Sequence, residues 1–192
     1  SLKDLKPTDR IAMPAIGSAQ HVILQMQAEK ELGDAKKLNQ QIVAMAHPDG
    51  TAAILSKREI TCHLSSPPFQ FEQHRDSDSH KVFDSYQVMG GSHTFNLVWA
   101  SEKWAKANPK LVKAFVDALT EATDFVNARP AEAAKIYATS EKSKSTVDEL
   151  LKDIKSDGIK YSMTPTGLIK FAAFMRKIGM IKTVPATWRD YA

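Results

Sequence analysis

Up to residue 90, short apolar runs alternate with segments of helical periodicity, and this alternation constrains the fold more than any other feature of the chain. Four apolar runs have the length of a strand: 9–14, 42–46, 60–64 and 80–88. Three helical patterns separate them: 19–32, 49–55 and 69–75. Strands that alternate with helices form a parallel sheet with right-handed crossovers. The sequence therefore predicts an α/β fold for this part of the chain.

The pattern changes after Gly90-Gly91 and becomes almost entirely helical from residue 101. One more strand is expected over 94–100. The expected helices begin near Ser101, Pro109, Pro130, Thr146 and Thr164, and the last one ends at Gly179. This change predicts a boundary near 90–96, which divides the chain into a region 1–92 and a region 93–192.

Composition excludes several classes of protein. Of the 192 residues 43% are hydrophobic, which indicates a globular chain, and the apolar runs are too short for a membrane span. The single cysteine, Cys62, excludes an intramolecular disulfide and a multi-cysteine zinc site. The net charge is only +4, and the basic residues of the second half alternate with acidic ones at helical spacing. We therefore expect a solvated helix surface and no nucleic-acid partner.

The most informative local feature is the turn Gly17-Ser18-Ala19-Gln20 between a predicted strand and a predicted helix. The N–H groups and positive dipole end of a helix N-terminus attract small anions. Glycine allows close approach, and a serine hydroxyl can join the contact. The simpler interpretation is that Ser18 only caps the helix. Both interpretations can hold together.

Two further loops follow predicted strands and point to the same edge of the sheet. His47-Pro48-Asp49 follows one strand, and Ser65 to Phe69 follows another. Ligands of open α/β sheets bind outside the carboxyl ends of the strands, so the three loops predict one pocket. Taken singly, Asp49 is expected to cap a helix, and Pro67-Pro68 is expected to form a rigid turn.

All six histidines lie at or before residue 93, yet no pair has the spacing of a metal-binding helix. We expect no metal and no cofactor. His63 is expected to be a half-buried strand residue with satisfied hydrogen bonds. Cys62 is expected to be an unreactive core thiol, because no helix N-terminus lies beneath it to lower its pKa. The first residues show no signal-peptide pattern, and this leaves the compartment open.

The order of these motifs resembles a known family. The sequence is similar to the substrate-binding proteins of ABC importers for nitrate, sulfonates and taurine, a group also called NitT/TauT or NMT1-like. The residues that carry the resemblance are Gly17-Ser18, His47-Pro48-Asp49, Ser66-Pro67-Pro68-Phe69, Gly90-Gly91 and Asn108 to Phe115.

The resemblance implies a type II periplasmic-binding-protein fold, in which two α/β lobes joined by two crossings hold a ligand. Residues 1–92 would form the complete second lobe, and 93–192 the return crossing with the C-terminal helical part of the first lobe. The N-terminal segment of a typical member would be absent from this sequence. By the same resemblance, Gly17, Ser18 and Gln20 would hold an anionic head group. Ser66, Pro67 and Phe69 would line the opposite wall, with His93 and Thr94 near the return crossing and His47 on the rim.

The preferred hypothesis is therefore a periplasmic or lipid-anchored solute receptor, not an enzyme, that passes a small molecule to a membrane permease. The ligand would favour a closed state by touching both lobes. Sulfonate, nitrate, bicarbonate and thiamine precursors all remain open as ligands. Two alternatives remain: an enzyme on the same fold, similar to thiamine-pyrimidine synthases or desulfinases, and a ligand-sensing regulatory domain.

Overall fold

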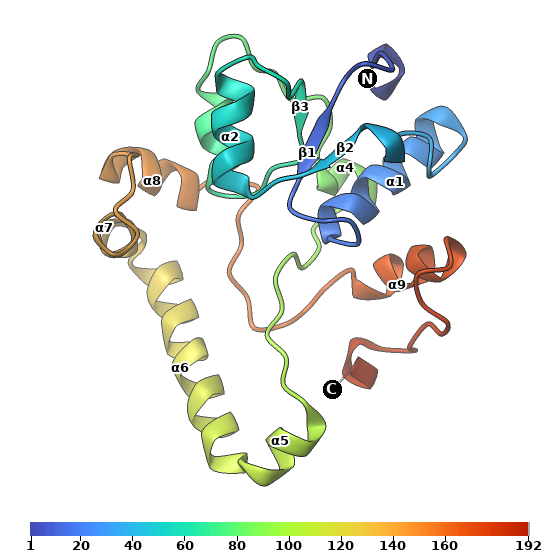
Figure 1. Cartoon of the computed structure of the whole chain (residues 1–192). Coiled ribbons are helices and arrows are strands. Elements are labelled where there is room, and N and C mark those ends of the chain that lie inside the picture. Colours follow the sequence, from blue (N-terminus) through green and yellow to red (C-terminus); the bar gives the residue numbers. More distant parts are fainter. Residues whose placement is uncertain (192) are drawn as a thin grey trace. The chain divides into compact units, whose positions relative to one another are not determined.

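The computed structural model describes residues 1–191, which fall into two compact units (Figure 1). Unit 1 contains residues 1–95 and 166–191, and unit 2 contains residues 96–165. The chain leaves unit 1 after Phe95 and returns to it at Thr166. These boundaries differ from the predicted division into 1–92 and 93–192, because residues 166–191 belong to unit 1. The assignment of either region to a lobe of a binding protein stays a prediction.

A small parallel sheet lies in unit 1, in the strand order β2-β1-β3. Its strands are β1 (Ile11–Met13), β2 (Ile42–Ala44) and β3 (Cys62–His63). In register, Ile11 of the central strand pairs with Ile42 on one side and with Cys62 on the other. The predicted α/β character is confirmed here, and the strands are shorter than the apolar runs that predicted them.

Unit 1 also contains helices before, between and after its strands. They are η1 (Leu2–Asp4), α1 (Ala19–Leu32), η2 (Asn39–Gln41), α2 (His47–Leu55), α3 (Phe69–His74), α4 (Ser85–Met89), α9 (Leu168–Lys177) and η3 (Trp188–Tyr191). The ends of α1 match the prediction. Ser18 is its N-cap, and Gly33, with φ of 75°, ends it in the left-handed conformation that glycine adopts without strain.

Helix α1 is the centre of the hydrophobic packing in unit 1. Its residues Leu24 and Ala28 pack with Ile11 and Met13 of the central strand. On another face, Val22 packs with Phe174 of α9. Burial of an aliphatic side chain of this size stabilises a fold by about 2 kcal/mol, so α1 holds the sheet and the returning segment together.

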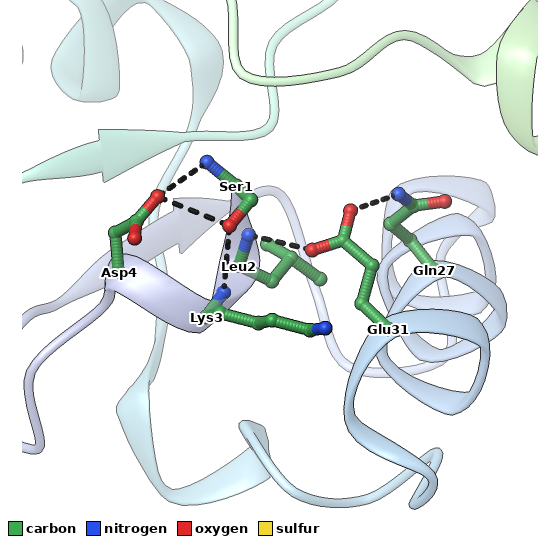
Figure 2. A network of polar contacts seen from close by, with 6 residues as sticks. All are labelled: Ser1, Leu2, Lys3, Asp4, Gln27 and Glu31. Carbon is green, nitrogen blue, oxygen red and sulfur yellow. Dashed lines mark hydrogen bonds and ion pairs between the residues drawn. The ribbon is translucent and has the colours of Figure 1, made fainter.

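The first residues are tied to the far end of α1, as Figure 2 shows. The backbone N–H of Leu2 donates to Oε2 of Glu31 at 2.9 Å, and Nε2 of Gln27 donates to the other carboxylate oxygen. Leu2 itself is buried in the core with Leu24. These contacts fix the chain that enters β1.

Two predicted strands are wrong. Residues 80–84 are irregular, and α4 follows them, because Asp84 and Gln87 form a capping box that starts a helix and Gly90 ends it with φ of 74°. Residues 94–100 run without a strand partner within the described chain. An apolar run alone does not make a strand unless a neighbouring strand takes up its backbone hydrogen bonds.

Two predicted helix starts also need correction. Asp49 is not a cap: α2 begins at His47 with Ala46 as its N-cap, because Pro48 fits the first helical turn. Helix α9 begins at Leu168 and not near Thr164, since Gly167 precedes it with φ of 74°.

Unit 2 is helical, as predicted. It contains α5 (Glu102–Ala107), α6 (Pro109–Ala128), α7 (Pro130–Ser140) and α8 (Val147–Ile154). Ser101 caps α5 by accepting the N–H of Trp104. Much of the apolar surface here is uncovered, and Trp99 is 86% exposed. Within residues 1–191, every helix is too short or too polar to cross a membrane.

Candidate functional site

Three connections leave the carboxyl ends of the parallel strands at one edge of the unit 1 sheet (Figure 1). The first leads from β1 to α1 through Gly17 and Ser18, and the second leads from β2 to α2 at His47. The third leads from β3 to α3 at Phe69. This is the edge at which open α/β sheets bind ligands. The structure thus brings together side chains from all three predicted loops.

A chain of polar side chains joins these connections. Nε2 of Gln20 lies 3.1 Å from Nε2 of His47, and Nδ1 of His47 lies 3.1 Å from Nε2 of His63. Nδ1 of His63 lies 2.8 Å from Nε2 of Gln73. We call Gln20, His47, His63 and Gln73 the polar chain. It crosses from α1 through α2 and β3 to α3.

The inner end of the polar chain is buried. Nε2 of Gln73 donates to Oγ1 of Thr51 at 2.8 Å and lies 3.3 Å from Oγ of Ser65. Gln73 is 7% exposed and Thr51 is 3% exposed. Because buried polar groups are costly unless they are hydrogen-bonded, this end is fixed in place.

An aromatic contact covers the outer part. The ring of Phe69 stacks on His47 with centroids 5.6 Å apart and an angle of 25° between the planes. His47 also lies 5.2 Å from His63, centroid to centroid. His47 is therefore held on two sides, by a hydrophobic ring and by a second imidazole.

Both imidazoles of the polar chain are neutral at pH 7. Burial lowers the pKa of His63 to about 4, and the neighbouring His47 adds to this effect. Burial alone lowers the pKa of His47. Because the two partners at the ends are amides, the polar chain has no net charge.

The turn before α1 has its own hydrogen bonds. The N–H of Gly17 donates to Nδ1 of His21 at 3.0 Å, and the N–H of His21 donates to Oγ of Ser18 at 3.3 Å. The prediction that Ser18 caps the helix is confirmed. Gly17 has φ of 87° and is exposed at the rim, but its N–H is already taken by His21.

The three residues expected on the opposite wall lie in different surroundings. Ser66 is 6% exposed, and its carbonyl accepts the N–H of Gln70 at the start of α3. Pro67 is exposed and joined to Pro68 by a cis peptide bond. Of the three residues expected on this wall, only Phe69 reaches the polar chain, through its stacking on His47.

His93 and Thr94 belong to a different cluster of unit 1. The ring of His93 meets Tyr86 and Phe171 edge-on, and burial lowers its pKa. The N–H of Thr94 donates to the carbonyl of Thr166 at 2.9 Å, and Oγ1 of Thr94 accepts the N–H of Thr166 at 2.8 Å. These bonds join the points at which the chain leaves unit 1 and returns to it.

Sequence reasoning missed most of the inner end of the polar chain. His63 is half-buried with partners on both ring nitrogens, as expected, but its link to His47 was not foreseen. A signal did exist: Thr51 follows His47 by four residues, and Gln73 follows Phe69 by four. Residues four apart on a helix lie on the same face.

Other candidate chemistry is weak. Cys62 is partly buried, and burial raises the pKa of its thiol, so it is protonated at neutral pH. Nowhere in residues 1–191 do three side chains of His, Cys, Asp or Glu gather as a metal site needs. A shallow depression of about 350 Å³ between Met45, Ala53 and Arg58 contains none of the predicted site residues.

Comparison with curated proteins gives no match, and comparison with solved structures gives none either. The sequence model of the NMT1-like family matches residues 3–140. This range includes the whole polar chain and every predicted site residue. Proteins of this family are usually non-enzymatic solute-binding components of ABC importers, although members with enzymatic roles exist. Because the matched residues make up well over half of the chain, the chain belongs to the NMT1-like family.

Proposed function

We propose that the chain is the solute-binding component of an ABC importer and works outside the cytoplasm. It binds a small anion at the carboxyl edge of the unit 1 sheet and delivers this anion to a membrane permease. The observation that supports this most is the polar chain. It links three strand-end connections through contacts of 2.8–3.1 Å, and Phe69 covers it on one side.

The chemistry of the rim favours an anion bound by N–H groups and not by an ion pair. Helix α1 has 14 residues and presents its N-terminus beside Gly17 and Ser18. Ser18 Oγ accepts only one N–H of the first turn, that of His21. The remaining N–H groups and the helix dipole attract negative charge. The neutral imidazole of His47 uses both ring nitrogens within the polar chain and adds no competing charge.

The proposed roles follow from position. Gly17, Ser18 and Gln20 would contact the anionic head group, His47 would complete the polar rim, and Phe69 would pack against the remainder of the ligand. Sulfonates such as taurine have an anionic head and an aliphatic body, so they suit this division. Nitrate and bicarbonate would use the polar part alone.

The test is a thermal melt of the 192-residue chain with nitrate, sulfate, bicarbonate, taurine and methanesulfonate in turn. Ligand at 100 times its dissociation constant adds about 2.7 kcal/mol to the free energy of unfolding. We expect one class of anion to raise the melting temperature. His47→Ala removes this response, whereas His74→Ala, at an exposed position at the end of α3, retains it.

A melt that no anion shifts, or a shift that survives His47→Ala, contradicts the proposal. The enzyme alternative is not favoured by the structure. A desulfinase-like reaction needs a reactive thiolate, and burial keeps the Cys62 thiol protonated at neutral pH.

A further inference from the structure

We infer that Gln73 is a positioning residue: it sets the direction in which hydrogen bonds run through His63 and His47 to Gln20, and thereby makes the rim a hydrogen-bond donor. The part that concerns the ligand rests on the proposed function. The direction itself is a property of the protein without a ligand and is tested separately.

Two neutral imidazoles in contact restrict the possible arrangements. A neutral imidazole carries one N–H donor and one bare nitrogen acceptor. Nδ1 of His47 and Nε2 of His63 are 3.1 Å apart, so one of them donates to the other. Once that choice is made, the protonation of the two remaining ring nitrogens is also fixed. The polar chain therefore has only two possible directions.

In the outward direction, Nε2 of Gln73 donates to Nδ1 of His63, and Nε2–H of His63 donates to Nδ1 of His47. Nε2–H of His47 then donates to the amide oxygen of Gln20. In the inward direction every bond is reversed, and Gln73 must accept through its oxygen. Gln20 and Gln73 cannot both donate to the imidazoles through their amide nitrogens. Two N–H groups would then face each other between His47 and His63.

The contacts favour the outward direction. The amide nitrogen of Gln73 has three partners within 3.3 Å, namely Thr51 Oγ1, His63 Nδ1 and Ser65 Oγ. The amide nitrogen of Gln20 has one partner, His47 Nε2. A half-turn of the Gln20 amide exchanges its oxygen and nitrogen at the cost of that single contact. The same turn in Gln73 would change three contacts, whereas burial does not distinguish the two amides, since Gln20 is 8% exposed and Gln73 is 7% exposed.

The outward direction leaves the amide N–H₂ of Gln20 beside the N-terminus of α1. Gln20 is 8% exposed, and its far amide atom makes no hydrogen bond with residues 1–191, so this is the atom that would meet the ligand. An N–H₂ group there donates to an oxygen of nitrate or a sulfonate, whereas an unpaired amide oxygen would repel it. A residue on α3 thus selects the ligand class through two imidazoles.

The direct test is the tautomer of each histidine, read from long-range ¹H–¹⁵N correlation spectra of the ¹⁵N-labelled chain at pH 8. We expect both His63 and His47 to carry the proton on Nε2 and to have a bare Nδ1. Protons on Nδ1 of both rings would overturn the inference. This readout needs no ligand and does not depend on the proposed function.

Variants test whether Gln73 is the cause. A carboxylate only accepts hydrogen bonds, so at pH 8 Gln73→Glu should place a proton on Nδ1 of His63 and reverse His47. Gln73→Met, which introduces no buried charge, should leave both rings as mixtures of tautomers. Gln41→Met is the matched control, because Gln41 is also buried but donates to the carbonyl of Lys6. Unchanged tautomers in both Gln73 variants would refute the inference.

Binding of methanesulfonate and nitrate separates the two proposals. Gln73→Glu should weaken either anion by about tenfold or more, since a donor at the rim becomes an acceptor. If the wild-type chain binds neither anion but shows the expected tautomers, the proposed function fails and the direction of the polar chain stands.

Discussion

A β-carbon on Gly50 would lie 2.8 Å from both Cε1 and Nε2 of His63, so the imidazole fills the space that a side chain on α2 would occupy. Gly50→Ala should push His63 away from His47. Overpacking of this kind costs about 1–3 kcal/mol, and the better helix propensity of alanine returns less than about 1 kcal/mol. We expect a net loss of free energy of unfolding, measured by urea denaturation.

Gly158→Ala is the control for this substitution. A β-carbon at Gly158 meets no atom within 4 Å, and its φ is not in the left-handed region. Its stability should change by less than about 0.5 kcal/mol. Equal effects at the two glycines would show that the close approach of Gly50 to His63 has no energetic weight.

The pKa of His63 makes stability depend on pH. It is lowered from 6.5 to about 4 in the folded chain, so below pH 6.5 the unfolded chain takes up a proton that the folded chain refuses. The free energy of unfolding should therefore fall as the pH falls from 6.5 towards 4, by at most about 3 kcal/mol. Partial solvent access of the ring reduces this value.

Urea denaturation at pH 7 and at pH 4.5 measures this loss. His63→Gln removes the titrating group, so the difference between the two pH values should shrink in that variant. A loss of the same size in wild type and His63→Gln would assign the acid sensitivity to other groups.

Ser18 and Ser101 make the same capping bond at the same length. Each accepts the N–H of the third residue after it at 3.3 Å, in unit 1 and in unit 2 respectively. Alanine at either position should cost about 1 kcal/mol of stability. Only Ser18→Ala should also weaken anion binding, measured by calorimetry, because only Ser18 lies at the proposed rim. Equal affinity in both variants would limit Ser18 to a capping role.

Gly167 allows the returning segment to touch His93. A β-carbon there would lie 2.7 Å from Cβ of His93, and the residue has φ of 74°. Gly167→Ala should lose about 1–2 kcal/mol from the backbone and further free energy from the overlap. Gly33→Ala isolates the backbone part, since Gly33 has φ of 75° with nothing within 4 Å. Similar urea midpoints for the two variants would mean that the contact is easily relieved.

Local signals predicted local structure well. Ser18 and Gly33 define both ends of α1, because a cap and a left-handed glycine act within one turn. The prediction of a strand over 80–88 was wrong because it passed over a local helix signal. The capping box of Asp84 and Gln87 was present in the sequence and was outweighed by the apolar pattern around it. Pairing partners, which decide whether residues 94–100 form a strand, cannot be read from one segment.

The sequence predicted which loops meet at the rim of the candidate site, and it did not predict the contacts in the interior. Parallel strands bring their carboxyl ends to one edge, and this rule alone placed Gln20, His47 and Phe69 together. The partners His63 and Gln73 depend on where a buried amide points, and that is set by packing around Thr51 and Gly50. Burial also decides that both imidazoles are neutral, which spacing along the sequence does not reveal.

The uncovered stretch from Leu97 to Trp99 has a consequence for every solution experiment above. It is apolar, has no regular secondary structure and lacks a strand partner within the described chain, and Val98 is 66% exposed. Exposed apolar patches of this kind promote association between identical copies of a chain. The particle size of this protein should grow with its concentration, and light scattering across a dilution series should find the range in which the chain is still a single molecule.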